Sequence, residues 1–134
     1  MGGKESNHGS VLRIYIQCSL LRRDPAMNIS ISPAVLAKLA GKHGVSGSEV
    51  RECFLNRDGG FLEDIREEHR SVPSTQWFIA ATNDRRMLKI VFVLRRTGAV
   101  ARCEIRTAYE PNAEEVRIYR KYGQGRLQTD WQET

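Results

Sequence analysis

Residues 75–111 read TQWFIAATNDRRMLKIVFVLRRTGAVARCEIRTAYEP and hold most of the strongly apolar, β-prone residues of the chain. Two turn-like segments, 83–85 and 96–98, divide the stretch into the runs 76–82, 87–95 and 99–109. Short polar turns between such runs are typical of hairpins, and Gly98 can supply a positive φ. The stretch therefore predicts a three-stranded antiparallel meander.

The alternation of side chains in the last two runs predicts one buried face. In the second run the even positions are apolar: Leu88, Ile90, Phe92 and Leu94. In the third run the odd positions from Ala101 to Tyr109 are apolar or weakly polar. The opposite face would carry four charged residues: Lys89, Arg102, Glu104 and Arg106. This face is either a solvated surface with cross-strand ion pairs or a surface that binds phosphates.

Helix signals precede the meander. Ser32 and Pro33 have the residue types of an N-cap and a first helical position, and they predict a helix over 33–42. Ser46 and Glu49 have the spacing of a capping box and predict a second helix that ends near Asn56. A short strand is expected at 61–65, after two glycines.

A charged loop at 66–70 and a last helix complete the expected order of elements. The loop is either solvated or flanks a site through Arg66 and His69. Asn112 is the expected N-cap of the last helix, which should end at Gly123. We predict an α+β fold with two N-terminal helices, a four-stranded, mainly antiparallel sheet covered by helices on one face, and a C-terminal helix.

Length and composition favour one domain with a polyanionic partner. The chain has 134 residues, a net charge of +5 and a sequence pI of about 9.4. Residues 27–123 are the expected domain, 1–26 an extension upstream of a candidate natural start at Met27, and 124–134 a polar tail. No apolar run reaches the ~20 residues of a membrane span, so no membrane partner is expected.

Three cysteines without a C-x-x-C pair and three scattered histidines favour neither a disulfide framework nor a metal site. We expect a cytoplasmic protein with no metal and no cofactor. The helix pair leaves a helix-turn-helix open, because Ala40, Gly44 and Val50 have a suitable spacing. In that case Arg51 and Asn56 are the outward residues suited to bases.

The run Lys42-His43-Gly44-Val45-Ser46 with Glu49, followed by Ile105-Arg106-Thr107-Ala108 and then Glu115 and Tyr119, resembles the BrnT-type toxins of bacterial type II toxin–antitoxin pairs. The likeness spans about residues 38–122. It implies a RelE-like ribonuclease fold, RNA as substrate and a cognate antitoxin as partner, and it leaves a homodimer open. Where such sequences usually have Arg after the Ala of the last strand, this chain has Tyr109.

Metal-free RNA cleavage needs a base for the 2′-hydroxyl, cations for the phosphorane and a proton for the leaving oxygen. Four residues are the expected catalytic groups: Arg106, His43, Glu104 and Tyr109. Five more are expected to bind nucleic acid: Lys42, Arg66, His69, Lys89 and Arg102. Within these sets, Arg106, Arg102 and Lys89 would bind the scissile phosphate, His43 or Glu104 would be the base, and Tyr109 or His69 would deliver the proton. Trp77 is a further candidate to stack on a base, although a core position suits it better.

Two other functions remain open from the sequence. One is a non-catalytic nucleic-acid-binding accessory protein of a mobile element. The other is an ADP-ribosyl-protein hydrolase, because residues 27–119 also resemble short bacterial proteins labelled ADP-ribosyl-(dinitrogen reductase) hydrolase. That chemistry would have only Glu63-Asp64 and Glu67-Glu68 as local carboxylate pairs.

Overall fold

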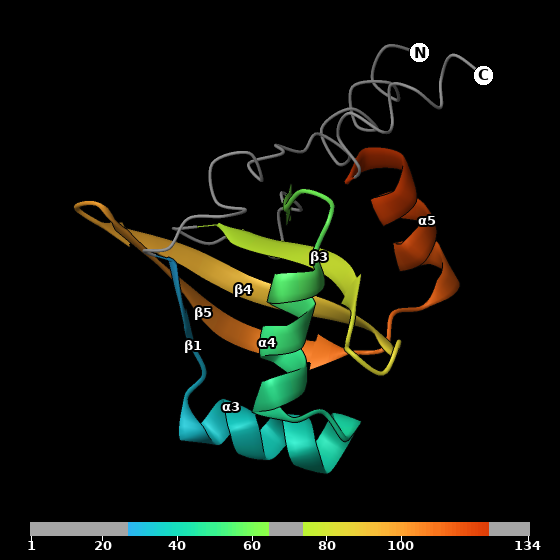
Figure 1. Cartoon of the computed structure of the whole chain (residues 1–134), viewed down its shortest axis with the longest axis horizontal. Coiled ribbons are helices and arrows are strands. Elements are labelled where there is room, and N and C mark those ends of the chain that lie inside the picture. Colours follow the sequence, from blue (N-terminus) through green and yellow to red (C-terminus); the bar gives the residue numbers. More distant parts are fainter. Residues whose placement is uncertain (1–26, 65–73, 124–134) are drawn as a thin grey trace.

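The computed structural model describes residues 27–64 and 74–123 (Figure 1). Their elements, in chain order, are strand β1 (Met27–Ser30), helix α3 (Pro33–Lys38), the π-helical turn η1 (Leu39–His43), helix α4 (Gly47–Asn56), and then strands β2 (Leu62–Glu63), β3 (Thr75–Ala81), β4 (Met87–Thr97) and β5 (Val100–Tyr109), followed by helix α5 (Ala113–Tyr122). The fold is α+β, as predicted. The predicted 1–26 extension, the 124–134 tail and the 66–70 loop with Arg66 and His69 lie outside the described residues.

The described strands form one sheet in the order β1-β5-β4-β3-β2. Strands β3, β4 and β5 are the predicted antiparallel meander, and β2 adds to it antiparallel to β3. The prediction of four strands was wrong, because β1 pairs in parallel with β5, with Met27 opposite Ala101. The described part of the sheet therefore has five strands and is mixed rather than mainly antiparallel. A four-residue edge strand whose partner lies about 70 residues away leaves little periodic signal in the sequence.

A β-bulge at Arg106 interrupts the predicted alternation of β5. Val91 pairs with Thr107 while its neighbour Phe92 pairs with Ile105, so Arg106 is an extra residue on β5. The odd positions are buried as predicted up to Ile105, but beyond the bulge the even position Ala108 is buried instead. Thr107 and Tyr109 thus lie on the face of Lys89, contrary to the prediction that they belong to the core face.

Helices lie on both faces of the sheet. On one face, the Phe54 ring of α4 contacts Phe78 and Phe92, and Figure 1 shows α4 across the strands. On the other face, the Tyr119 ring of α5 contacts Trp77, the neighbour of Phe78 along β3. Adjacent residues of a strand point to opposite faces, so the expectation that all helices cover one face was wrong.

The predicted helix starts are confirmed. The Ser32 side chain accepts a hydrogen bond from Val35 N, and capping boxes join Ser46 to Glu49 and Asn112 to Glu115. The first helical segment ends in the π turn η1, where Gly44 takes a left-handed conformation with φ 61°. Among the described residues, no helix has both the length and the apolar character needed to cross a bilayer.

Candidate functional site

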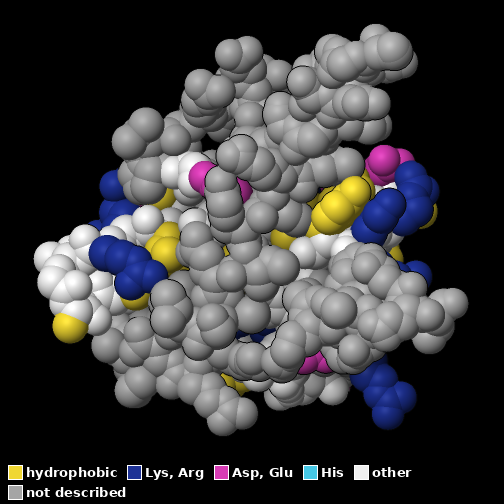
Figure 2. Space-filling model, turned by 90° about the horizontal axis from the view of Figure 1, so that it is seen from above, with side chains coloured by type: hydrophobic (Ala, Val, Ile, Leu, Met, Phe, Trp, Pro, Cys, Tyr) yellow, Lys and Arg dark blue, Asp and Glu magenta, His cyan; other side chains and the backbone are white. Residues whose placement is uncertain are grey.

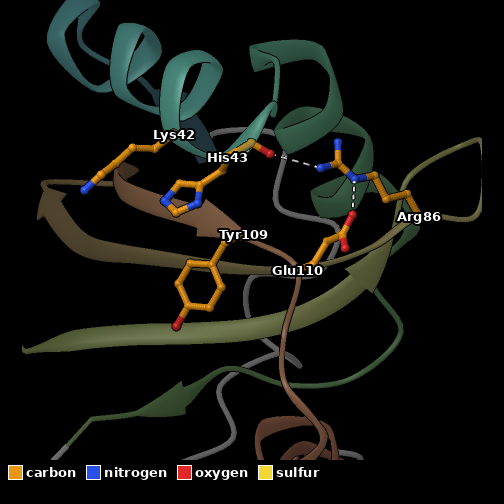
Figure 3. Close-up of a pocket in the computed structure, with 5 residues that line it drawn as sticks. All are labelled: Lys42, His43, Arg86, Tyr109 and Glu110. Atoms are coloured by element: carbon orange, nitrogen blue, oxygen red, sulfur yellow. Dashed lines mark hydrogen bonds and ion pairs between the residues drawn. The ribbon is translucent and has the colours of Figure 1, made fainter.

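A pocket of about 540 Å³ opens where η1 meets the end of β5. Its lining residues come from three parts of the chain: Lys42 and His43 from η1, Arg86 from the β3–β4 connection, and Tyr109 and Glu110 from the end of β5 (Figure 3). This volume is in the range of sites that bind small molecules. Three of the residues predicted from sequence, Lys42, His43 and Tyr109, therefore line the same pocket.

The His43 and Tyr109 rings lie side by side in this pocket. Their centroids are 5.6 Å apart, with an angle of 42° between the ring planes. His43 is the last residue of η1, and the left-handed Gly44 turns the chain directly after it. The bulge at Arg106 shifts the alternation of side chains along β5 by one residue. Tyr109 therefore points to the side of the sheet on which the pocket lies. The pairing thus depends on two backbone irregularities.

Arg86 fixes the backbone behind His43. Its guanidinium donates to the carbonyl oxygens of His43 (3.1 Å) and Gly44 (2.9 Å). The same group forms ion pairs with Glu49 (3.1 Å) and Glu110 (2.9 Å), which link the start of α4 to the end of β5. All these partners hold the guanidinium inside the protein's own network, so Arg86 is a scaffold for the pocket rather than an open cation.

The pKa values around Arg86 reflect this network. The hydrogen bond to Glu110 raises the pKa of Arg86, and the bond and charge of Glu49 act in the same direction against the effect of burial. The backbone N–H of Ser46 lowers the pKa of Glu49, and Arg86 lowers it further. Both groups are therefore charged at neutral pH. Sequence reasoning missed Arg86, because an Arg beside a turn has no local feature that distinguishes it from a solvated residue.

Lys89 is held beneath helix α5. Its ammonium forms an ion pair of 2.9 Å with Glu115, and the side chains of the two residues are only 12% and 18% exposed. The same ammonium lies 4.3 Å from the centre of the Trp77 ring. Burial raises the pKa of Glu115, but the hydrogen bonds from Lys89, the Asn112 backbone and the Tyr109 hydroxyl outweigh it, so the pKa lies below its usual value. Lys89 is thus a structural cation.

The Tyr109 hydroxyl also belongs to this cluster. It donates to Glu115 at 3.0 Å, so its proton is directed at a carboxylate of the protein. In Figure 3 the hydroxyl points away from His43, while the ring lies next to it. The part of Tyr109 that the pocket offers to a ligand is therefore the ring.

Arg102 and Glu104 lie at the other end of β5. Glu104 forms ion pairs of 2.9 Å with both Arg102 and Arg95, which face each other across β4 and β5. The hydrogen bonds from Arg95 and then Arg102 lower the pKa of Glu104. The Arg95–Glu104 ion pair joins β4 to β5, as in the interpretation with cross-strand ion pairs, whereas the Arg102–Glu104 pair lies within β5. On the face that Figure 2 shows, described Lys and Arg side chains are visible at opposite sides of the molecule.

Of the remaining candidates, Arg106 is exposed, and the others make contacts within the protein. Arg106 is exposed at the bulge, and its carbonyl oxygen accepts from Lys38 at 3.3 Å. The two residues that a helix-turn-helix would present to bases are used internally: Arg51 donates to Ile29 O, and Asn56 donates to Ala81 O and to the Asn83 side chain. Trp77 packs against Tyr119, in agreement with the core position that suited it better.

Metal-ligand and thiol chemistry have little support in the described ranges. No group of three His, Cys, Asp or Glu residues is placed to hold a metal ion in 27–64 and 74–123. Burial raises the pKa of both Cys53 and Cys103 to about 12, so neither is a ready nucleophile.

A comparison with models of known protein families found no match for this chain, and a comparison with curated proteins found none. The pocket offers the His43 imidazole, the Lys42 side chain and the Tyr109 ring.

Proposed function

We propose that the protein is a metal-independent RNA endonuclease with a RelE/BrnT-like fold, the toxin of a cytoplasmic toxin–antitoxin pair, and that its active site is the pocket at η1 and the end of β5. The observation that carries this proposal is the placement of His43 beside Tyr109, next to Lys42. The three side chains supply a base, an aromatic surface and a cation, which are the groups that recognition and cleavage of a single RNA strand require.

In the proposed reaction, His43 accepts the proton of the ribose 2′-hydroxyl. The 2′-oxygen attacks the adjacent phosphorus, and the bond from phosphorus to the 5′-oxygen breaks. The products are a 2′,3′-cyclic phosphate and a 5′-hydroxyl, whose proton comes from water in the open pocket. Imidazole suits the first step because histidine is the side chain that most often serves as a general base.

Lys42 would stabilise the negative charge that develops on the phosphate oxygens. Of the two cations that line the pocket, Arg86 has two carboxylate partners, whereas no carboxylate of the described residues lies within ion-pair distance of Lys42. In Figure 3 the Lys42 ammonium extends to the side of the His43 ring. Lys42 is exposed, so its ammonium is free to reach a phosphate oxygen on which negative charge develops.

The Tyr109 ring would stack on an unpaired base. Its hydroxyl is bonded to Glu115, so the ring is held in place and loses little freedom when a ligand binds. Stacking of a base on an aromatic side chain contributes about 1–3 kcal/mol and tolerates any base. We therefore assign Tyr109 to substrate binding instead of proton delivery.

The test is cleavage of single-stranded RNA by the purified protein in EDTA. Wild type should yield 2′,3′-cyclic phosphate ends, and a 2′-deoxy substitution at the cleaved position should block the reaction. We expect His43→Ala to lose at least about 10²-fold in rate, the usual contribution of a general base. Arg120→Ala is the matched control, because it removes an exposed cation of α5 that does not line the pocket. Equal rates for wild type and His43→Ala would refute the assignment.

A second candidate, a nucleic-acid-binding protein without cleavage, is favoured by one observation. The Arg86 guanidinium and the Tyr109 hydroxyl are both directed at carboxylates of the protein, which leaves His43 as the pocket's proton acceptor without an evident proton donor. This candidate predicts salt-dependent retention of intact RNA in a gel with no cleavage products.

A further inference from the structure

We infer that Lys38 and Arg106 form a second phosphate contact, beside the pocket, that holds the neighbouring nucleotide of the RNA strand. This inference rests on the proposed function, because it concerns the same substrate. It adds Lys38, a residue without a role in the pocket, and it gives Arg106 the role of binding a phosphate that is not cleaved.

Lys38 and Arg106 touch each other although 68 positions separate them. The Lys38 ammonium donates to the Arg106 carbonyl oxygen at 3.3 Å. Lys38 ends α3, and Lys42 lies four residues further on in η1, which follows α3 directly. The Lys38–Arg106 contact is therefore next to the wall of the pocket that Lys42 forms.

The position of Arg106 in a β-bulge supports a functional role. Bulges occur near active sites, where the extra residue turns a side chain away from the regular pattern of the sheet. Here the extra residue is itself a cation, and it is exposed. The same bulge turns Tyr109 toward the pocket, so one irregularity places both a base-stacking ring and a positive charge.

Three cations of this region have no carboxylate partner among the described residues. Five other described cations form ion pairs with carboxylates: Arg86, Lys89, Arg95, Arg102 and Arg117. By contrast, no ion pair joins Lys38, Lys42 or Arg106 to a described carboxylate. Grouped positive charges without internal partners raise the local concentration of anions. Successive phosphates of one RNA strand would match a row of such cations.

The test measures how binding depends on salt, with a substrate that cannot be cleaved. The probe is a fluorescent 2′-deoxy single strand of about 12 nucleotides, a length within the range that single-strand-binding domains cover. Each phosphate contact contributes a slope of about −0.7 to the plot of log affinity against log salt for single strands. Lys38→Gln and Arg106→Gln should each reduce the slope by that amount.

The expected loss of affinity follows from the same relation. If the electrostatic contribution vanishes near 1 M salt, one lost contact weakens binding about eightfold at 50 mM and about threefold at 200 mM. Lys38→Arg should keep the wild-type slope because it keeps the charge. Arg120→Gln should also keep it, because Arg120 lies on α5 outside the pocket lining.

The outcomes separate this inference from the proposed function. If Lys38→Gln and Arg106→Gln bind with the wild-type slope while cleavage still depends on His43, the second contact is refuted and the proposed function stands. If the strand does not bind and RNA is not cleaved, both fail. If a poly-glutamate peptide binds in a Lys38- and Arg106-dependent way but the strand does not, this surface serves an acidic protein and the inference is refuted.

Discussion

Replacing Arg86 with methionine should destabilise the protein and disorganise the pocket together. Methionine keeps an unbranched chain of similar length but removes every donor. The Glu49 carboxylate, which is 26% exposed, and the carbonyl oxygens of His43 and Gly44 would lose the guanidinium. The two carbonyl oxygens are backbone atoms, so they cannot turn toward other donors as a side chain could.

The size of the effect follows from the exposure of each partner. Glu110 is 65% exposed, so its ion pair contributes at most about 1 kcal/mol to stability. Hydrogen bonds to charged groups contribute about 1.5–3 kcal/mol each when buried, and the 27% exposure of Arg86 argues for the low end. Because one residue makes all the bonds and they are not additive, we expect a total loss of about 3 kcal/mol.

The assay is urea unfolding followed by far-UV circular dichroism, compared at constant m. Arg86→Lys should fall between wild type and Arg86→Met, since an ammonium keeps the charge but not the planar fork. Glu110→Gln should cost less than about 1 kcal/mol. A loss below 1 kcal/mol for Arg86→Met would contradict the idea that Arg86 holds these segments together.

Three further predictions concern other parts of the structure. Glu115→Gln should remove a contribution to the free energy of unfolding. In wild type this contribution is present above the ordinary carboxyl pKa of 4.5, and it disappears as pH falls through the lowered pKa of the folded state. The melting temperatures of wild type and variant should therefore converge below that range. Gly44→Ala should cost about 1–2 kcal/mol in the same urea assay, entirely from the left-handed backbone, because no atom lies within 4 Å of the added Cβ. Native Cys53 and Cys103 should resist iodoacetamide at pH 8 and react in urea, as peptide-resolved mass spectrometry can show; rapid native labelling would contradict their burial.

Local features of the fold were predictable from the sequence. The meander, the buried even positions of β4 and the two capping boxes each depend on residues close to one another along the chain. Strand β1 was not predictable in this way, because its four residues gain their stability from pairing with a strand near the other end of the domain. The bulge at Arg106 was equally invisible, since one extra residue leaves composition and polarity unchanged.

The candidate site was predictable only in part, for a related reason. Lys42 and His43 were identified through a short motif, and Tyr109 through the strand that ends with it. The network of Arg86 joins three distant segments, so no spacing in the sequence indicates it. Lys89 and Arg102 were expected to offer their charges to phosphates. In the structure each forms an ion pair with a carboxylate, Lys89 with one from α5 and Arg102 with one from β5.

The extra residue at position 106 also determines on which face of the sheet each of the last side chains of β5 lies. If β5 were regular and Arg106 paired with Val91, the phenol of Tyr109 would be directed at the buried face that the small, fully buried Ala108 now occupies. The methyl group of that alanine would then stand beside the imidazole. Whether a residue at an odd or an even position of β5 lies next to His43 thus depends on the bulge. Related chains should therefore be aligned by the pairing of their strands before their functional residues are compared.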